Sequence, residues 1–441
     1  MDGLKHPEWT RKAVIYQIHT RQFSTEGTFR GIEPHLPRLR ELGVSILWLM
    51  PIHPIGEKNR KGPLGSPYAV KDYFGVNPEL GTMEDFTHLV NAVHALDMKI
   101  ILGWVPNHTA WDNALTEEHP EWYARNWKGD FHPTPWLDWD DIIDLDYSVP
   151  AVREYMTAAM EWWVHTTDID GFRCDVAMFV PTDFWEETRR RLDAIKPVFM
   201  LAEAETKDLH EHAFDMTYAW SWYDAMRNLA AGGPDQTPSR DLSELYEYYA
   251  LNVKMFQPWA QRMTFLSNHD KNAWEGTQFE QFGPAVEAAI VLSVLGEGIP
   301  LIYNGQEAEN RRRLSFFDRD PIEWRDARIG DLYRSLIALR KRLPALDNAP
   351  WGARMEQVVL TENGRDGRKN GSPVFAFVRR NDQGRLFALL NFSPEHRIVR
   401  PADELSHDTY RDFTTKRSVT VDGETLFKLG PWEYRVLVDE P

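Results

Sequence analysis

Residues 168–177 read DIDGFRCDVA, a short apolar run that ends on an arginine and an aspartate two residues apart. Successive side chains of a β-strand point to opposite faces, so Arg173 and Asp175 share one face while Cys174 takes the other. A pair of this kind is often a structural ion pair and nothing more. Whether it serves chemistry here depends on what accompanies it along the chain.

The composition is that of a large globular protein with an acidic balance. The chain has 441 residues, with 67 acidic and 50 basic side chains and a formal net charge of −17. This balance argues against nucleic acid and against an anionic membrane as partners, because both select basic patches. The 18 tryptophans can serve the core, or they can stack on the apolar faces of sugar rings.

Cysteine usage and the N-terminus bear on the cellular compartment. A single cysteine excludes an intramolecular disulfide. The N-terminal stretch MDGLKHPEWTRKAV lacks the apolar run of a signal peptide, and no run in the chain approaches a membrane span. We expect a cytoplasmic protein, as a monomer or small homo-oligomer, with export after removal of a leader as the alternative.

Apolar, strand-like runs alternate with amphipathic, helix-like segments from residue 13 to about 345. The eight runs are AVIYQIH (13–19), SILWLMP (45–51), KIILGWV (99–105), GFRCDV (171–176), VFMLAEA (198–204), FDMTYAW (214–220), RMTFLSN (262–268) and IPLIYNG (299–305). Eight strand–helix repeats predict an α/β fold, a closed (β/α)8 TIM barrel. The competing doubly wound sheet would want a Gly-rich dinucleotide turn after an early strand, and the chain has none.

Two segments depart from this alternation. Residues 109–150 are rich in Trp and Asp and too long for a plain βα connection, so they predict a small inserted subdomain after the third strand. From about residue 349 the chain alternates short strands with turns, which predicts a C-terminal antiparallel β-sandwich. The expected domains are a barrel in two parts (1–108 and 151–348), the insertion (109–150) and the sandwich (349–441).

Acidic and histidine side chains stand at the ends of several predicted strands, where the catalytic groups of such barrels gather. Asp175 ends the fourth strand, Glu203 the fifth and Asp270 the seventh. His108 follows the third strand, and His269 precedes Asp270. Such a set suits glycoside cleavage, in which one carboxylate attacks or stabilises the sugar cation and a second protonates the leaving oxygen. A metal site is the rival use, but no HExxH or close-spaced ligand pair supports it.

These motifs resemble those of the α-amylase family of glycoside hydrolases along nearly the whole chain. GFRCDVA is similar to the family's Gly-x-Arg-x-Asp motif, which implies Asp175 as the nucleophile with Arg173 beside it. MLAEAE implies Glu203 as the acid/base. FLSNHD implies that His269 binds sugar hydroxyls and that Asp270 stabilises the transition state.

Further stretches extend the resemblance. VPNH implies His108 at the sugar subsite and a structural Asn107, and SPYAVKDY implies that Tyr68 stacks on the sugar. GIPLIYNGQE is similar to the family's strand-eight motif. The resemblance also implies a domain B in the insertion, a C-terminal sandwich and an anomer-retaining mechanism through a covalent glycosyl-enzyme.

Some positions depart from the family pattern. Gly103 stands where the strand-three motif usually opens with an Asp that supports the arginine. Met178 and Phe179 stand where many α-amylases carry a Lys-His pair that grips the leaving-group sugar and helps to hold calcium. We therefore expect no required cofactor, no metal ligands and no calcium of the usual kind. Val176, directly after the implied nucleophile, also occurs in α-1,6-acting relatives.

The leading hypothesis is a hydrolase of α-glucosidic bonds, foremost α-1,4, in starch-derived glucans or malto-oligosaccharides. One alternative is an α-glucosidase or transglucosylase, in either case with α-1,4 or α-1,6 action. The three acids cannot discriminate these, because water and sugar acceptors compete for the same intermediate. A non-enzymatic alternative is a carbohydrate-binding protein that lost catalysis, for which Gly103 is the one supporting feature.

Overall fold

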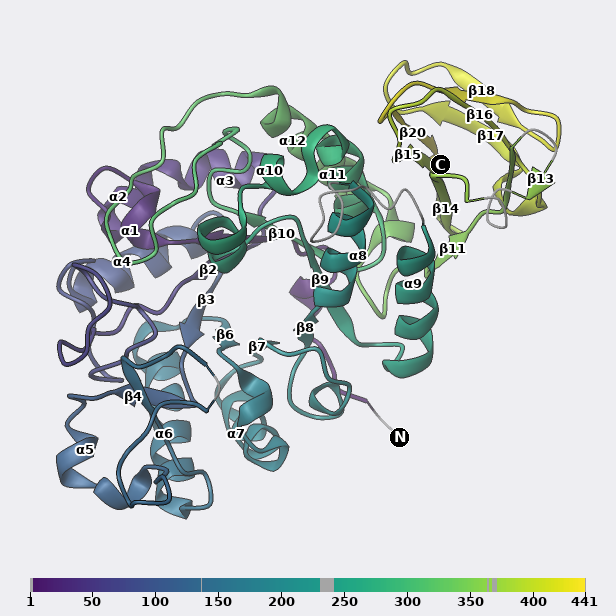
Figure 1. The fold of residues 1–441 in the computed structure, drawn as a ribbon. Helices are drawn as coiled ribbons and strands as arrows, with labels where there is room; N and C mark the ends of the chain where they lie inside the picture. The colour runs from purple at the N-terminus through teal and green to yellow at the C-terminus, as the bar shows by residue number, and fades with distance from the viewer. Residues whose placement is uncertain (1–2, 136, 231–241, 363–364, 367–370, 441) are drawn as a thin grey trace. The chain divides into compact units, whose positions relative to one another are not determined.

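The computed structural model describes residues 3–135, 137–230, 242–362, 365–366 and 371–440. Eight parallel strands close into a barrel in the order β1-β10-β9-β8-β7-β6-β3-β2 (Figure 1). They are β1 (Ile15–Ile18), β2 (Ile46–Leu49), β3 (Lys99–Trp104), β6 (Gly171–Cys174), β7 (Phe199–Ala202), β8 (Met216–Tyr218), β9 (Gln261–Phe265) and β10 (Ile299–Tyr303). Each predicted run contains one of these strands or all but its first residue, so the predicted TIM barrel is confirmed.

The helices begin and end where the sequence supplies the signals. α4 starts on a capping box, in which the Asp85 backbone N–H donates to Thr82 Oγ1 and the Thr82 N–H donates to Asp85 Oδ2. α6 has Pro150 at its first position and ends before Asp168, whose φ is 58°. The helices are α1 (Thr20–Phe23), α2 (Phe29–Ile32), α3 (Leu36–Leu42), α4 (Met83–His94), α5 (Leu115–Glu118), α6 (Pro150–Thr167), α7 (Thr182–Ile195), α8 (Trp220–Ala230), α9 (Ser243–Met255), α10 (Gln278–Phe282), α11 (Val286–Leu295) and α12 (Arg328–Arg342). Among the described residues, none of these helices is long and apolar enough to cross a bilayer.

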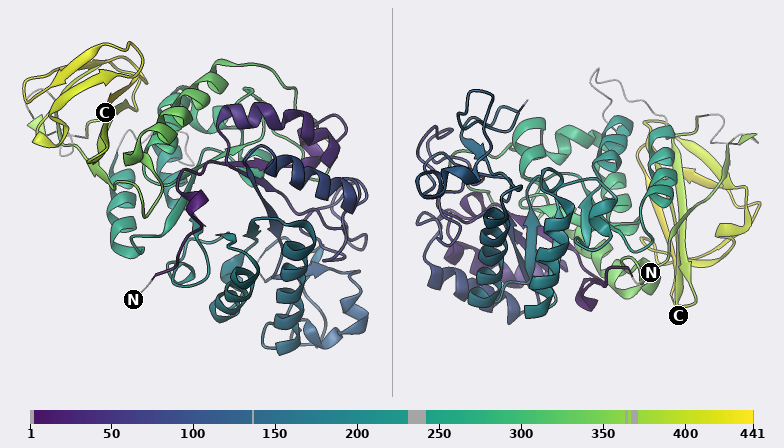
Figure 2. Two further views of the ribbon diagram at one scale, coloured as in Figure 1. Left: turned by 180° about the vertical axis from the view of Figure 1, so that it is seen from behind. Right: turned by 90° about the horizontal axis from the view of Figure 1, so that it is seen from below.

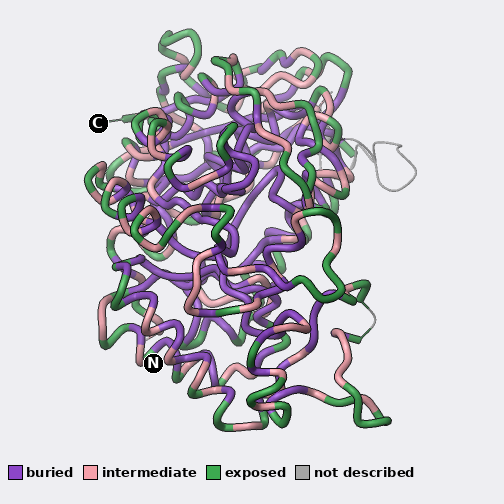
Figure 3. Tube along the Cα trace, turned by 90° about the vertical axis from the view of Figure 1, so that its left-hand side faces the viewer, coloured by how far each residue is buried: buried purple, intermediate pink, exposed green. Residues whose placement is uncertain are grey.

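The chain packs as two compact units. The first comprises residues 1–218, 302–305 and 312–325, and the second comprises 219–301, 306–311 and 326–441. These packing units cut across the predicted domains, whose limits stay a prediction. The barrel strands and most of α11 are buried, and the buried stretches run through the interior of the trace in Figure 3.

In the first unit, the two faces of the barrel strands have different roles. Trp104 of β3 packs its ring against Phe172 of β6, with ring centres 5.5 Å apart, on the side that faces the helices. The next residue pair on the opposite face is Gly103 and Arg173, which lie side by side in the parallel ladder. Figure 1 shows α4, α6 and α7 outside these strands. The inner face is therefore the one that carries polar groups.

The insertion after β3 is fastened to the strand it follows. β4 (His108–Ala110) and β5 (Ile142–Asp144) form a two-stranded antiparallel sheet. The Asn107 amide donates to Asp144 Oδ1 at 3.1 Å, and Thr134 Oγ1 donates to the same oxygen at 2.6 Å. Asn107 thus ties the end of the barrel strand to the insertion, which agrees with its implied structural role.

Two antiparallel sheets follow α12, as the sequence predicts. The six-stranded sheet has the order β11-β14-β15-β20-β17-β18, and the four-stranded sheet has the order β13-β12-β16-β19 (Figure 2, yellow). Their shared core includes Phe387 and Leu437 from the first sheet and Val399 and Phe427 from the second. The strands are β11 (Met355–Gln357), β12 (Leu360–Glu362), β13 (Arg365–Asp366), β14 (Val374–Asn381), β15 (Gly384–Asn391), β16 (Arg397–Pro401), β17 (Asp408–Asp412), β18 (Ser418–Val421), β19 (Phe427–Leu429) and β20 (Tyr434–Asp439).

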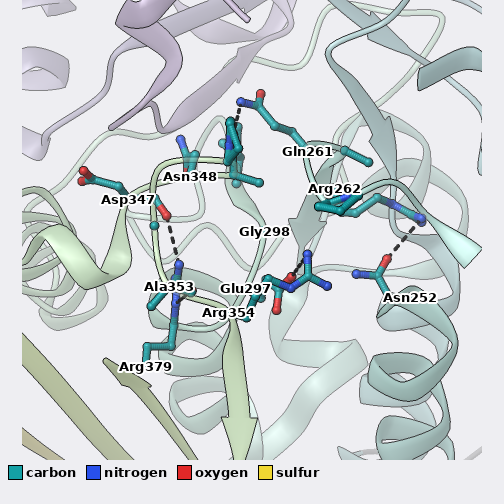
Figure 4. Close-up of a pocket in the computed structure, with 16 residues that line it drawn as sticks. Asn252, Gln261, Arg262, Glu297, Gly298, Asp347, Asn348, Ala353, Arg354 and Arg379 are labelled. Atoms are coloured by element: carbon teal, nitrogen blue, oxygen red, sulfur yellow. Dashed lines mark hydrogen bonds and ion pairs between the residues drawn. The ribbon is translucent and has the colours of Figure 1, made fainter. Parts of the chain in front are cut away.

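A cavity of about 200 Å³ in the second unit lies beside a buried arginine of the C-terminal sheet (Figure 4). Arg379 of β14 donates to four backbone carbonyls: those of Gly296, Asp347 and Ala353, at 2.8, 3.0 and 3.0 Å, and that of Leu295, at 3.5 Å. Burial lowers the pKa of Arg379 to about 10, so the guanidinium stays charged at neutral pH. The nitrogens of the Arg379 guanidinium all donate to backbone oxygens, so the role of this residue is structural.

Gly171 at the start of β6 provides a test of the barrel's packing. Its φ is 146°, and a Cβ added there would come within 1.9 Å of the Phe199 carbonyl oxygen on β7. We expect Gly171→Ala to destabilise the fold by roughly 3 kcal/mol or more, because backbone conformation and backbone contact both oppose a side chain. Urea denaturation measures this loss.

The matched control is Gly423→Ala, where the nearest atom to the added Cβ is 3.8 Å away. The control should shift the urea midpoint little. Equal effects of the two substitutions would contradict the packing described for β6 and β7.

Candidate active site

A buried guanidinium joins two carboxyl groups in the first unit. Arg173 Nη1 donates to Asp175 Oδ1 at 2.5 Å, and Nη2 forms an ion pair with Glu203 Oε1 at 2.9 Å. The arginine side chain is fully buried, whereas the side chains of Asp175 and Glu203 are 9% and 14% exposed. The structure therefore brings these three predicted site residues together, with the two acids at the accessible end.

Backbone hydrogen bonds continue the strand ladder to both acids. The Asp175 N–H donates to the Trp104 carbonyl at 2.8 Å, and the Glu203 N–H donates to the Cys174 carbonyl at 2.9 Å. Each acid is thus fixed at the carboxyl end of its strand by a neighbouring strand. Catalytic side chains of TIM barrels take this position.

Val176 turns the chain sharply beside the two acids. Its φ of 35° and ψ of 45° are left-handed, which is unusual for a β-branched residue and costs of order 1–3 kcal/mol. This conformation accompanies a hydrogen bond from the Val176 N–H to Glu203 Oε2, at 2.8 Å. Glu203 is therefore held at one oxygen by the backbone and at the other by Arg173, an arrangement that the sequence motif did not reveal.

The pKa of Glu203 suits a group that gives and takes a proton near neutral pH. Burial and, to a lesser extent, the charge of Asp175 raise this pKa to about 7. Arg173 and the Val176 N–H act in the opposite direction. A carboxyl group poised in this way is typical of a general acid/base.

Three aromatic rings surround the guanidinium. The Arg173 Cζ lies 5.2 Å from the ring centre of Trp48, 5.8 Å from that of Tyr68 and 5.6 Å from that of Tyr218. Tyr218 also accepts a hydrogen bond from Arg173 Nε at 3.2 Å. Tyr68, predicted to stack on the sugar, therefore lies beside the predicted acids. Trp48 and Tyr218 were not predicted as site residues, because no motif marks them.

His108 lies in the same unit but contacts a different set of residues. The ring is buried, and its Nδ1 lies 3.2 Å from the Asn107 amide nitrogen. Its ring centre is 5.8 Å from that of Trp139 in the insertion. Burial lowers the pKa of His108 to about 4, so the ring is neutral at neutral pH. A neutral imidazole can hydrogen-bond a hydroxyl, so its sugar-binding role stays a prediction.

Asp270 and His269 belong to the second unit. His269 is buried, and its Nε2 lies 3.2 Å from Asp270 Oδ2, whose side chain is 43% exposed. The preceding residue, Asn268, accepts a hydrogen bond from the Lys271 N–H at 2.8 Å and shapes the turn after β9. The structure brings these two predicted residues together, and their relation to Asp175 and Glu203 stays a prediction.

The comparison with protein families decides the identity. The α-amylase catalytic domain matches residues 15–326, which cover well over half of the chain. This chain belongs to the α-amylase family of glycoside hydrolases.

Related α-amylases align along most of the chain. Alpha-amylase MalA from Haloarcula japonica is 28% identical over 96% of this chain, which spans 62% of the length of MalA. Two crystal structures are similar in fold. The noncanonic maltogenic α-amylase AmyB from Thermotoga neapolitana has a TM-score of 0.85, with 29% identity over 98% of this chain and 99% of that one. An α-amylase from Lactobacillus plantarum has a TM-score of 0.83, with 30% identity over the same shares.

Two departures from the α-amylase motifs have visible consequences. The η4 turn (Ala177–Phe179) exposes Met178 and Phe179 by 43% and 48%, directly after Asp175 and Val176. Among the described residues, no group of three or more His, Cys, Asp or Glu side chains is placed to share a metal ion. That the chain binds no calcium of the usual kind stays a prediction.

Gly103 is the second departure, and its surroundings are crowded. A Cβ at this position would lie 2.7 Å from Pro51 Cδ, 2.8 Å from Pro51 N and 3.1 Å from the Leu49 carbonyl. We expect Gly103→Asp to destabilise the protein by about 1–3 kcal/mol and to leave kcat no higher, because these atoms must shift to admit any side chain. Urea denaturation and initial rates on maltoheptaose measure both quantities.

Gly103→Ala separates the steric effect from the carboxylate. It adds the same Cβ without the charge, so it should destabilise the protein comparably. An aspartate variant of wild-type stability and higher kcat would show that the strand accepts the family's residue without cost.

Proposed function

We propose that this chain is a retaining hydrolase of α-1,4-glucosidic bonds in starch-derived glucans or malto-oligosaccharides. The observation that carries the proposal is the sharing of one buried guanidinium by Asp175 and Glu203. Retaining glycosidases keep their two carboxyl groups only about 5 Å apart, whereas inverting enzymes separate them by about 6.5–9.5 Å to admit a water. Two acids on one guanidinium fit the closer spacing.

The proposed reaction has two steps. Asp175 attacks the anomeric carbon while the bond to the leaving sugar breaks and Glu203 gives its proton to the departing oxygen. Water then attacks the anomeric carbon, Glu203 takes a proton from it, and the bond to Asp175 breaks. The chemistry needs only these carboxyl groups and water, so the proposal requires no cofactor. We assign Asp270 as the third acid on the strength of its family motif.

The substrate class is supported by the relatives. MalA is named an α-amylase and AmyB a maltogenic α-amylase, names that point to α-1,4-linked glucans. Tyr68 beside the acids offers an aromatic face of the kind that stacks on sugar rings.

A second candidate is an α-glucosidase or transglucosylase, for which α-1,6 action is included. It is favoured by the exposed side chains of Met178 and Phe179, which follow Asp175 closely along the chain. An apolar surface there could seat a sugar acceptor in competition with water. The third alternative, a binding protein without catalysis, would have no use for a carboxyl group poised near neutral pH.

Product analysis on maltoheptaose, isomaltose and soluble starch tests these readings. Wild type should release short malto-oligosaccharides early, with the α-anomer formed first in the NMR spectrum. Asp175→Asn should lose activity by at least about 10³-fold, because the nucleophile is gone. Asp183→Asn, which changes a largely exposed acid paired with Arg153, is the matched control and should retain activity.

The products separate the candidates. Glucose or longer transfer products alone would favour the glucosidase or transglucosylase, and turnover of isomaltose would indicate α-1,6 action. A folded wild type that turns over none of these substrates would refute the hydrolase and leave the binding protein.

The pH profile tests the role of Glu203. A general acid must be protonated in the free enzyme, so kcat/KM should fall as the pH rises through about 7, the pKa of this group. Glu203→Gln should remove this basic limb and lower kcat/KM on maltoheptaose by about 10²–10⁴-fold.

An activated aryl α-maltoside provides the control, since its leaving group needs no proton. Glu203→Gln should form the covalent intermediate from it nearly as fast as wild type, whereas Asp175→Asn should not. An unchanged basic limb in Glu203→Gln would assign the proton transfer to another residue.

A further inference from the structure

The three nitrogens of the Arg173 guanidinium each face a different group. Nη1 meets Asp175 and Nη2 meets Glu203, the two residues that do the proposed chemistry. Nε donates to the Tyr218 hydroxyl at 3.2 Å. A guanidinium is planar, so a hydrogen bond at Nε fixes the direction in which the other two nitrogens point.

Tyr218 stands at the end of β8, next to β7, the strand that carries Glu203 at its tip. Its ring meets the indole of Trp48 on β2 edge to face, with centres 6.5 Å apart and planes at 80°. Both rings lie within 6 Å of the Arg173 Cζ. Trp48 and Tyr218 therefore form an aromatic corner, which limits rotation of the guanidinium.

The corner matters because the guanidinium is cut off from water. The Arg173 side chain is fully buried, and its ladder neighbour on β3 is Gly103, which offers no side-chain acceptor. A buried charge must be held by fixed partners, since solvent cannot replace a lost one. A small rotation would lengthen the contact to one acid or the other.

We infer that Tyr218, braced by Trp48, is a positioning residue that sets the orientation of Arg173 and, through it, the alignment of Glu203 with Asp175. This inference rests on the proposed roles of Asp175 and Glu203. The groups that act on Arg173 are Glu203, Tyr218, Tyr68 and Asp175. Those that act on Glu203 are Arg173, Asp175 and the Val176 N–H.

The direction of the effect follows from these contacts. The positive charge of Arg173 lowers the pKa of Glu203 and so partly offsets burial. A guanidinium that is free to turn loses part of this contact, and the pKa of Glu203 then rises. The acid stays protonated to higher pH, so the basic limb of kcat/KM moves upward.

Tyr218→Phe tests the inference, because it removes one oxygen and keeps the ring. We expect kcat on maltoheptaose to fall about 10-fold with KM changed less than about twofold, since misalignment by a fraction of an ångström affects the transition state more than binding. The basic limb should rise by about half a pH unit. Tyr410→Phe is the control, because it removes a buried hydroxyl bonded to the Ser406 carbonyl in the C-terminal sheet. This control should change neither kcat on maltoheptaose nor the pH position of the basic limb.

The Trp48 variants provide a second arm. Trp48→Phe keeps an aromatic face and should retain most of the wild-type kcat and pH profile. Trp48→Leu removes the face, so it should lower kcat and raise the basic limb, as Tyr218→Phe does. If Tyr218→Phe does not fold, the difference in kcat and basic limb between Trp48→Phe and Trp48→Leu tests the inference, and equal values in the two variants would overturn it.

Stability and activity together separate the outcomes. A Tyr218→Phe protein that is less stable but has the wild-type kcat and basic limb would show a merely structural tyrosine and overturn the inference. Wild-type activity in Asp175→Asn would instead overturn the proposed function, whatever Tyr218→Phe does.

Discussion

The burial of one positive charge is the constraint on which this site depends. Arg173 has no access to water, so its charge must be balanced inside the protein, and Asp175 and Glu203 supply the balance. A buried ion pair of this kind need not add to stability, because desolvation offsets the attraction. The ion pairs instead fix geometry, because two carboxyl groups bound to one planar guanidinium are kept at a short distance from each other.

Other features of the first unit follow from this constraint. Glu203 sits where burial raises its pKa while the guanidinium limits the rise, so the group titrates near neutral pH. Val176 adopts a strained, left-handed conformation in the turn whose N–H holds the second oxygen of Glu203. Strain at such a position is commonly accepted for function.

Much of the fold could be predicted because its signals are local. Each barrel strand is a short apolar run, and α4 and α6 carry a capping box and an N-terminal proline. The sequence also predicts that Asp175 and Glu203 lie at the same rim, because both stand at the ends of consecutive strands of the predicted barrel. The contacts of Trp48 and Tyr218 could not be predicted, because residues 170 positions apart meet only after the barrel closes.

Gly103 is a second position whose contacts could not be predicted from the sequence. In the sequence it is only a missing carboxylate, whereas in the structure an added Cβ would come within 2.7 Å of the Pro51 ring. The sequence by itself determined the order of the strands, the acids at their ends and the family, because these depend on periodicity and on short motifs. The tertiary structure alone decided which atoms hold Arg173 and what pKa Glu203 takes. Burial and charge act over distance in space, and distance in space is set by packing rather than by position along the chain.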